Sequence, residues 1–290
     1  MFPSLAQLAP DSKRPNVGSF ELDDIPAELL VQIVSSSSDD VHKLALSLCA
    51  TNWFFKKLCD EGGVWKAFLR YLKWGVDWDT GLTSKEFFEM TRKLSDTHRT
   101  RLLNLDKTTT TIEAGAFKDC EELSLKALPP NITTIGDSAF ENCELLALTS
   151  LPPKLIKIGA RAFYDCDGIS LTTLPETVTT IGRHAFVGCD NLALESLPPK
   201  LTVIQTSTFI DCKKLVLNEL PPNITTIKWR AFSGCDNLRL AELPPSLTSI
   251  RSGAFIDCNN LSRGVKIAIL NLNPQAFETL NGENTVHLGV

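Results

Sequence analysis

Seven of the nine cysteines are evenly spaced, and evenly spaced thiols could form disulfides, bind metals or react as nucleophiles. Each lies 23 residues from the next, at Cys120, Cys143, Cys166, Cys189, Cys212, Cys235 and Cys258. If units of this length stack like strands, about 4.8 Å apart, neighbouring cysteines come within disulfide range. In one column, however, the side chains point in parallel, and seven thiols cannot all pair. We therefore expect buried free thiols that pack as small apolar side chains, with disulfides as the less favoured alternative.

Other patterns that support metal binding or catalysis are missing from the sequence. It contains no C-x-x-C pair, and its histidines, at His42, His98, His184 and His287, lie at no ligand spacing from a cysteine. The phosphate-binding motifs G-x-x-x-x-G-K-[ST] and G-x-G-x-x-G are absent, as are H-E-x-x-H and G-x-S-x-G. We expect a protein without enzymatic activity, bound metal or cofactor.

Composition narrows the classes of partner. The net charge of -5 supplies no excess of cations to neutralise a nucleic-acid backbone. No apolar run reaches the length of a membrane-spanning helix, and residues 1–15 lack the pattern of a secretion signal. We therefore expect no nucleic-acid or membrane partner and a cytoplasmic or nuclear location. The length of 290 residues favours about two domains.

The cysteines belong to a repeated unit that covers more than half of the chain. A phenylalanine lies three residues before each of the seven, and an isoleucine lies five residues before each phenylalanine. The unit reads C-x-x-L-x-L-x-x-L-P-P-x-[IL]-x-x-I-x-x-x-A-F-x-x-C, without insertion or deletion. Since 23 residues cannot enclose a core alone, the units must stack into a solenoid.

Three segments of the unit have recognisable local preferences. The L-x-L alternation predicts a short strand with one face inward, which stacking would pair into a parallel sheet. Pro-Pro removes two backbone donors and ends that strand. The I-T-T-I-G stretch predicts a second extended segment, whereas A-F-x-x-C suits a turn of helix.

The repeated unit resembles the leucine-rich repeats of the BspA-like class, also called the TpLRR class. The resemblance implies a right-handed solenoid of seven 23-residue coils with short parallel strands over residues 106–263. It also implies a module that binds protein partners and performs no catalysis. Residues 264–290 are expected to close the solenoid, because Ala276-Phe277 repeats the Ala-Phe pair one residue out of phase.

The first hundred residues form a different expected domain, which contains four of the five tryptophans. We expect a disordered tail over residues 1–19, a small helical domain over 20–72, and a linker with an N-terminal capping helix over 73–105. Thr83 and Glu86 have the spacing of a capping box, and an amphipathic pattern follows them. We expect this helix to cover the open first coil of the solenoid.

The order of residue types in the helical domain resembles an F-box: [LI]-P-x-E-L-L-x-x-I, then a tryptophan, L-C-D and V-W. The resemblance implies docking to the Skp-type adaptor, and through it to the cullin, of a cullin-RING ubiquitin ligase. It assigns adaptor binding to Ile25, Pro26, Leu29, Leu30, Ile33, Leu44, Leu46, Trp53 and Trp65. The alternative is that many of these residues form the core of an ordinary three-helix module. The expected fold class is α+β, with a small all-α three-helix head before the solenoid.

Partner binding within the repeats is expected at positions that packing leaves free. The turn before Ala-Phe varies most, and its candidates are Arg161, Arg183, His184, Lys228, Trp229, Arg230 and Arg251. Trp229 lies between two cations, an arrangement typical of interface anchors, and an acidic segment of a partner would complement it. The equal alternative is that the indole folds down over the neighbouring coil.

The favoured function is that of a substrate receptor in an SCF-type ubiquitin ligase, with the F-box docked to the adaptor and the repeats holding a protein target. The alternative is a repeat scaffold unconnected with ubiquitin. A secreted adhesion protein is disfavoured by the unpaired thiols and the missing signal.

Overall fold

The computed structural model describes residue 76 and residues 78–279. The chain divides into two compact units, one of residues 1–76 and 82–93 and the other of residues 77–81 and 94–290. Helix α5 (Ser84–Lys93) belongs to the first unit, and every other described element belongs to the second. The F-box-like segment 20–72, with all nine predicted adaptor contacts, lies outside the described residues.

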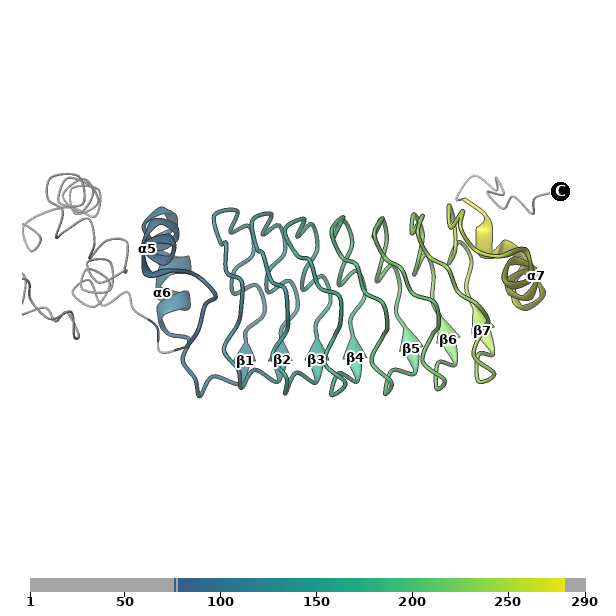
Figure 1. The fold of residues 1–290 in the computed structure, drawn as a ribbon, viewed down its shortest axis with the longest axis horizontal. Helices are drawn as coiled ribbons and strands as arrows, with labels where there is room; N and C mark the ends of the chain where they lie inside the picture. Colours follow the sequence, from purple (N-terminus) through teal and green to yellow (C-terminus); the bar gives the residue numbers. More distant parts are fainter. Residues whose placement is uncertain (1–75, 77, 280–290) are drawn as a thin grey trace, which may run out of the picture. The chain divides into compact units, whose positions relative to one another are not determined.

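The second unit contains a solenoid of stacked coils with short parallel strands (Figure 1). Each coil contributes one two-residue strand: β1 (Thr111–Ile112), β2 (Thr134–Ile135), β3 (Lys157–Ile158), β4 (Thr180–Ile181), β5 (Val203–Ile204), β6 (Thr226–Ile227) and β7 (Ser249–Ile250). Paired residues differ by 23 in number, so the register is that of the sequence repeat. The strand isoleucines point into the core and are at most 4% exposed.

The strands occupy the second extended stretch of the unit, so the prediction that L-x-L would form the sheet is wrong. Both leucines of L-x-L are buried, as the alternation indicates. Between the first coils this segment forms one hydrogen bond, from the Ala147 amide to the Leu125 carbonyl at 3.0 Å. The Leu-Pro-Pro turn begins three residues after the second leucine, and this leaves too little chain for a longer ladder.

The A-F-x-x-C segment is not the predicted turn of helix. In every coil, the residue before this segment and the residue before its cysteine have positive φ, for example Arg161 at 55° and Asp165 at 50°. Alternate amides then point along the stack: Phe117 donates to Ala139 of the next coil at 2.8 Å, and Phe140 donates to Ala162 at 2.9 Å. Because these donors bond to a neighbouring coil, a helical pattern of bonds within the segment cannot form.

Columns of phenylalanine and cysteine fill the core. From Phe117 to Phe255, successive rings stack with centroids 5.4–5.7 Å apart. The cysteines are free and buried, as expected, and from Cys143 onward each thiol donates to the phenylalanine carbonyl of the preceding coil at 2.9–3.0 Å. Burial raises the pKa of the Cys120 thiol to about 12 and raises the pKa of the other thiols further. The column is therefore a packing element of unreactive thiols.

The sheet breaks between β4 and β5, giving a four-stranded and a three-stranded sheet. Up to β4, the residue after the strand is a glycine in three coils, Gly136, Gly159 and Gly182. A Cβ on Gly182 would lie 2.4 Å from the backbone nitrogen of Ala160, so only glycine permits this approach. The break coincides with the replacement of glycine by Gln205 at this position. The coils remain joined across the break by bonds such as that from the Phe186 amide to the Thr208 carbonyl at 2.9 Å.

Two helices close the ends of the stack. Thr83 and Glu86 form the predicted capping box, but the helix ends at Lys93, and a separate helix, α6 (Asp96–Leu103), covers the first coil. Arg101 of α6 donates to the carbonyl of Ala116 in that coil at 2.7 Å. At the other end lie α7 (Arg263–Leu272) and the 3-10 helix η3 (Pro274–Phe277), where Phe277 continues the ring column, at 6.1 Å from Phe255.

Candidate protein-interaction surface

All seven predicted partner-binding residues lie on one surface of the solenoid. We call it the turn surface and define it as the three positions after each strand: residues 113–115, 136–138, 159–161, 182–184, 205–207, 228–230 and 251–253. The third position has positive φ in every coil. Glycine occupies this position only in the first and last coils, whereas the other coils have Ser138, Arg161, His184, Ser207 and Arg230 there. A left-handed conformation costs a non-glycine residue roughly 1–2 kcal/mol. Each non-glycine residue at this position therefore makes its turn less stable than a glycine would.

Charge changes sign along the turn surface. The first two coils present Glu113 and Asp137, whereas the later coils present the predicted cations. The cations form two groups, one at residues 161–184 and one at 228–251, separated by the uncharged residues 205–207. The seven residues therefore do not form one continuous patch.

Arg161 takes part in a structural ion pair. Its guanidinium lies 3.0 Å from the carboxylate of Glu141, which is buried and also lies 3.2 Å from the Lys118 ammonium. Burial alone would raise the pKa of Glu141, but hydrogen bonds from Ser138, Arg161 and Lys118 outweigh burial and lower it. Because Glu141 compensates its charge, Arg161 is a weak candidate for partner binding.

Arg183 is exposed, whereas His184 beside it is half-buried. Burial lowers the pKa of His184, and the charges of Arg161 and Arg183 lower it further. Its ordinary pKa of 6.5 is already below neutrality, so His184 is uncharged at pH 7. Within the described part of the chain, Arg183 is therefore the cation of the first group that forms no ion pair.

The second group includes an exposed tryptophan, and we call Lys228, Trp229, Arg230 and Arg251 the Trp229 cluster. Trp229 is 37% exposed, because its neighbours in the adjacent coils are the smaller residues Thr206 and Ser252. The Arg230 guanidinium lies 4.8 Å from the centre of its ring, and the Lys228 ammonium donates to the Gln205 side chain at 2.7 Å. The indole thus makes a cation–π contact with Arg230 and keeps part of its surface exposed to solvent.

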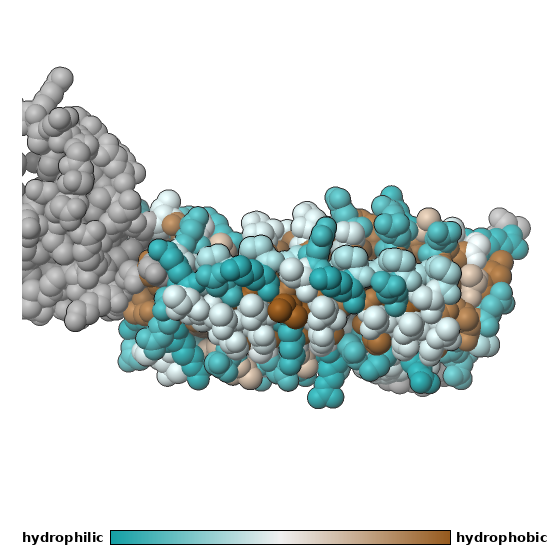
Figure 2. All heavy atoms as spheres, turned by 90° about the horizontal axis from the view of Figure 1, so that it is seen from below, coloured by the Kyte–Doolittle hydropathy of each residue, from teal (hydrophilic) through white to brown (hydrophobic). Residues whose placement is uncertain are grey.

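Exposed large hydrophobic side chains are few elsewhere on the described surface: Leu145, Ile156, Ile267 and Leu272. Figure 2, which looks onto the strand edge from below, shows a mainly hydrophilic face with small, separate hydrophobic areas. On this side, the described residues form no continuous apolar surface on which a partner could dock. Among the exposed hydrophobic residues, Trp229 combines apolar area with adjacent cations.

The described residues contain no group of three or more His, Cys, Asp or Glu side chains that could hold a metal ion. No helix within the same residues is long and apolar enough to cross a membrane.

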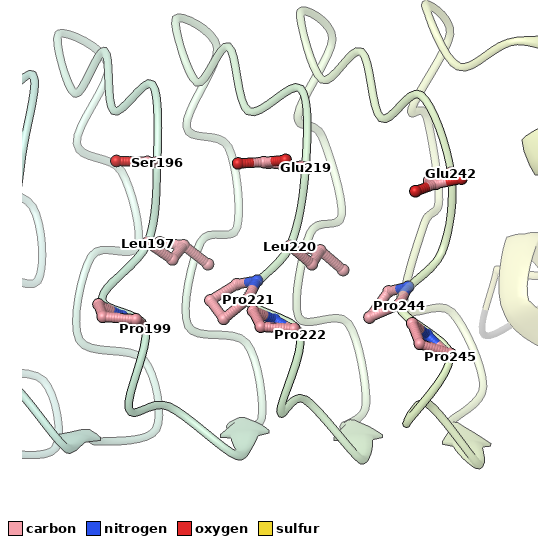
Figure 3. Close-up of a pocket in the computed structure, with 10 residues that line it drawn as sticks. All are labelled: Ser196, Leu197, Pro199, Glu219, Leu220, Pro221, Pro222, Glu242, Pro244 and Pro245. Carbon is pink, nitrogen blue, oxygen red and sulfur yellow. The ribbon is translucent and has the colours of Figure 1, made fainter.

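A groove over the Pro-Pro turns of three coils was not predicted from the sequence (Figure 3). It has a volume of about 390 Å³ and runs from Ser196 to Pro245. Two features of the sequence could have indicated it: Pro-Pro occurs in three successive units, and a glutamate stands two residues before it in the last two, at Glu219 and Glu242.

Comparison with known proteins identifies the repeats. The family model of the BspA type leucine rich repeat region matches residues 94–216 and 146–262, more than half of the chain. No curated protein matches the chain. No catalytic family is indicated by these comparisons.

Several solved structures resemble the chain. A leucine-rich repeat protein of T. pallidum is 29% identical, with a TM-score of 0.49 over 57% of this chain and 77% of its own. A leucine-rich cell surface protein of Faecalibacterium prausnitzii is 29% identical, with a TM-score of 0.47 over 53% of this chain and 42% of its own. A leucine-rich repeat protein of Bacteroides ovatus is 28% identical, with a TM-score of 0.42 over 51% and 45%. This chain thus spans less than half the length of the latter two. By the match to the family model, the chain belongs to the BspA-type leucine-rich repeat family, a class of repeat scaffolds that bind proteins.

Proposed function

We propose that this chain is a non-catalytic scaffold whose repeats bind a protein partner at the Trp229 cluster. The observation that carries the proposal is the exposed indole of Trp229 among three cations, on a surface otherwise poor in large apolar side chains. The partner presents an acidic segment, because Lys228 and Arg230 flank Trp229 in its turn, Arg251 begins the next turn, and no acidic residue of the turn positions 205–207 or 251–253 balances them.

The proposal assigns different roles to the members of the cluster. The indole supplies buried area on binding, as tryptophan does at the centres of many interfaces. Arg230 contacts the face of the ring and pairs with a carboxylate of the partner, while Lys228 and Arg251 steer the acidic segment. Mutation of the indole is expected to increase the dissociation rate, whereas mutation of the outer cations is expected to lower the association rate and its salt dependence.

The test compares two variants that remove exposed apolar area. Trp229→Ala removes the proposed anchor, and Leu145→Ala removes a side chain that is 54% exposed on an earlier coil. Affinity for a partner isolated with the wild-type chain is expected to fall by about tenfold to a hundredfold in Trp229→Ala, the range of an interface hot spot. Leu145→Ala should bind as the wild type does. Equal affinity of all three proteins would refute the proposal.

The second candidate function is substrate recognition for an SCF-type ubiquitin ligase. It is supported by the resemblance of residues 20–72 to an F-box, and it places the chain in the cytoplasm or nucleus with the repeats holding the target. The test is copurification of the full chain with a Skp-type adaptor and cullin. The double variant Leu30→Asp/Trp65→Ala is expected to lose the adaptor and keep the repeat-bound partner. If the wild type binds no adaptor, the ligase function is wrong and the scaffold proposal is unaffected.

A further inference from the structure

The groove over the Pro-Pro turns is a second surface with the opposite charge. Proline rings of three coils form one row of its lining, namely Pro199, Pro221, Pro222, Pro244 and Pro245. Figure 3 shows a second row beside it, made by the side chains of Ser196, Glu219 and Glu242, with Leu197 and Leu220 between the two rows. The groove therefore pairs an apolar floor with a carboxylate rim, both parallel to the axis of the stack.

Only in this part of the solenoid does the proline row run through three successive coils. In the third unit, Glu176 stands in place of the second proline, so the row is interrupted between Pro153 and Pro199. The rim also changes there, because the position of Glu219 and Glu242 is held by Ala127, Ser150 and Thr173 in the earlier units. The proline floor thus extends over the last three Pro-Pro turns, and the last two of these also carry the acidic rim.

The two rim carboxylates are available to a ligand. Glu219 and Glu242 are both exposed, and neither forms an ion pair with a residue in the described part of the chain. They are equivalent residues of adjacent coils, and the rings of Phe209 and Phe232 put adjacent coils 5.5 Å apart. One guanidinium can donate to two carboxylates at such a spacing, because its five N–H donors point in several directions within one plane.

We propose that this groove binds an extended peptide segment that carries an arginine flanked by aromatic or aliphatic side chains. The arginine pairs with Glu219 and Glu242, and the flanking side chains lie on the proline rings. Three coils span two steps of 5.5 and 5.6 Å. At about 3.3 Å per residue, three to four extended residues match this length.

The probe is a fluorescein-labelled peptide Gly-Ser-Phe-Arg-Phe-Ser-Gly, whose binding to the full chain is followed by fluorescence anisotropy at low salt. We expect saturable binding that weakens at least about tenfold in Glu219→Gln/Glu242→Gln, since charge-assisted hydrogen bonds are lost while the shape of the side chains is kept. The matched control Glu121→Gln removes an exposed carboxylate from the first coil and should change the dissociation constant less than about twofold.

Two altered probes distinguish binding in the groove from nonspecific electrostatic attraction. A probe with Gln in place of Arg should bind weakly and equally to the wild type and the double variant. A probe with Gly in place of both Phe residues should also bind more weakly, because it leaves the proline rings uncovered. The Trp229→Ala variant should bind the original probe as the wild type does, so this inference and the proposed function fail independently.

Several results would overturn the inference. These are no saturable binding up to about 1 mM, equal affinity for the Arg and Gln probes, equal affinity of the wild type and the double variant, or loss of probe binding in Trp229→Ala. Self-association in sedimentation velocity that the double variant abolishes would assign the groove to a second copy of the chain and would also overturn it.

Discussion

Replacing a central phenylalanine of the ring column should cost about twice as much free energy as replacing the terminal one. Phe186 is fully buried, with the rings of Phe163 at 5.4 Å and Phe209 at 5.7 Å, tilted by 15° and 3°. Phe277 is also buried, and its place at the end of the column puts its ring beside that of Phe255 alone among the seven repeat phenylalanines, at 6.1 Å and 36°. In Phe186→Leu most of the apolar area remains, so the main loss is two stacked pairs.

Each aromatic pair contributes about 0.5–1.5 kcal/mol beyond the burial of area. Phe186→Leu is therefore expected to lower the free energy of unfolding by roughly 1–3 kcal/mol, and Phe277→Leu by roughly half of that. Urea unfolding followed by far-ultraviolet circular dichroism at 25 °C measures both. The reasoning assumes that each coil is stabilised by contacts with its two neighbours. A cost for Phe277→Leu equal to or above that for Phe186→Leu would refute it.

Three further predictions concern thiols, glycine and a buried carboxylate. In the native chain at pH 8, Cys189 should resist alkylation by iodoacetamide because burial raises its pKa, whereas Cys120 at the end of the column should react first among the repeat thiols. Peptide mass spectrometry measures the labelling of both, and rapid labelling of Cys189 would contradict the account. Gly182→Ala should destabilise the fold by roughly 1–3 kcal/mol through a backbone clash, while Gly264→Ala in α7, where a Cβ meets nothing within 4 Å, should stabilise it by roughly 0.5–1 kcal/mol in the same urea assay. Glu141→Gln should lower the free energy of unfolding at pH 7. Because the folded pKa of Glu141 is lowered, the stabilisation by this carboxylate is complete above the ordinary pKa of 4.5 and disappears as pH falls through the folded pKa. A stability difference between wild type and variant that stays constant from pH 7 to pH 3 would contradict this prediction.

The columns of the core could be predicted from the sequence because the period has no insertion. An unbroken period places equivalent residues in equivalent environments, so Cys143 and Cys166 or Phe140 and Phe163 had to lie in register. The choice of strand could not be predicted. Hydrophobic alternation indicates which side chains are buried, and both the L-x-L segment and the strand segment bury their apolar side chains. The two segments differ in the hydrogen bonds that they form between coils, and alternation does not indicate these.

The positive φ values of the turn surface could not be predicted from the sequence, for a different reason. Positive φ is normally signalled by glycine, but glycine marks this position only at Gly115 and Gly253. At Arg161 and Arg230 the neighbouring coils impose the conformation, and no local preference of the residue reveals it. The exposure of Trp229 likewise depends on the adjacent coils, since a larger residue at Thr206 or Ser252 would have covered the indole.

The most direct test of the account is a comparison of the proteins retained by immobilised wild type, Trp229→Ala and Leu145→Ala, followed by measurement of dissociation constants with each purified partner. The account predicts a partner with an acidic segment that binds the wild type and Leu145→Ala equally, binds Trp229→Ala at least about tenfold more weakly, and is released by raised salt. Partners whose dissociation constants are the same for Trp229→Ala and the wild type would contradict the assignment of the Trp229 cluster as the binding surface.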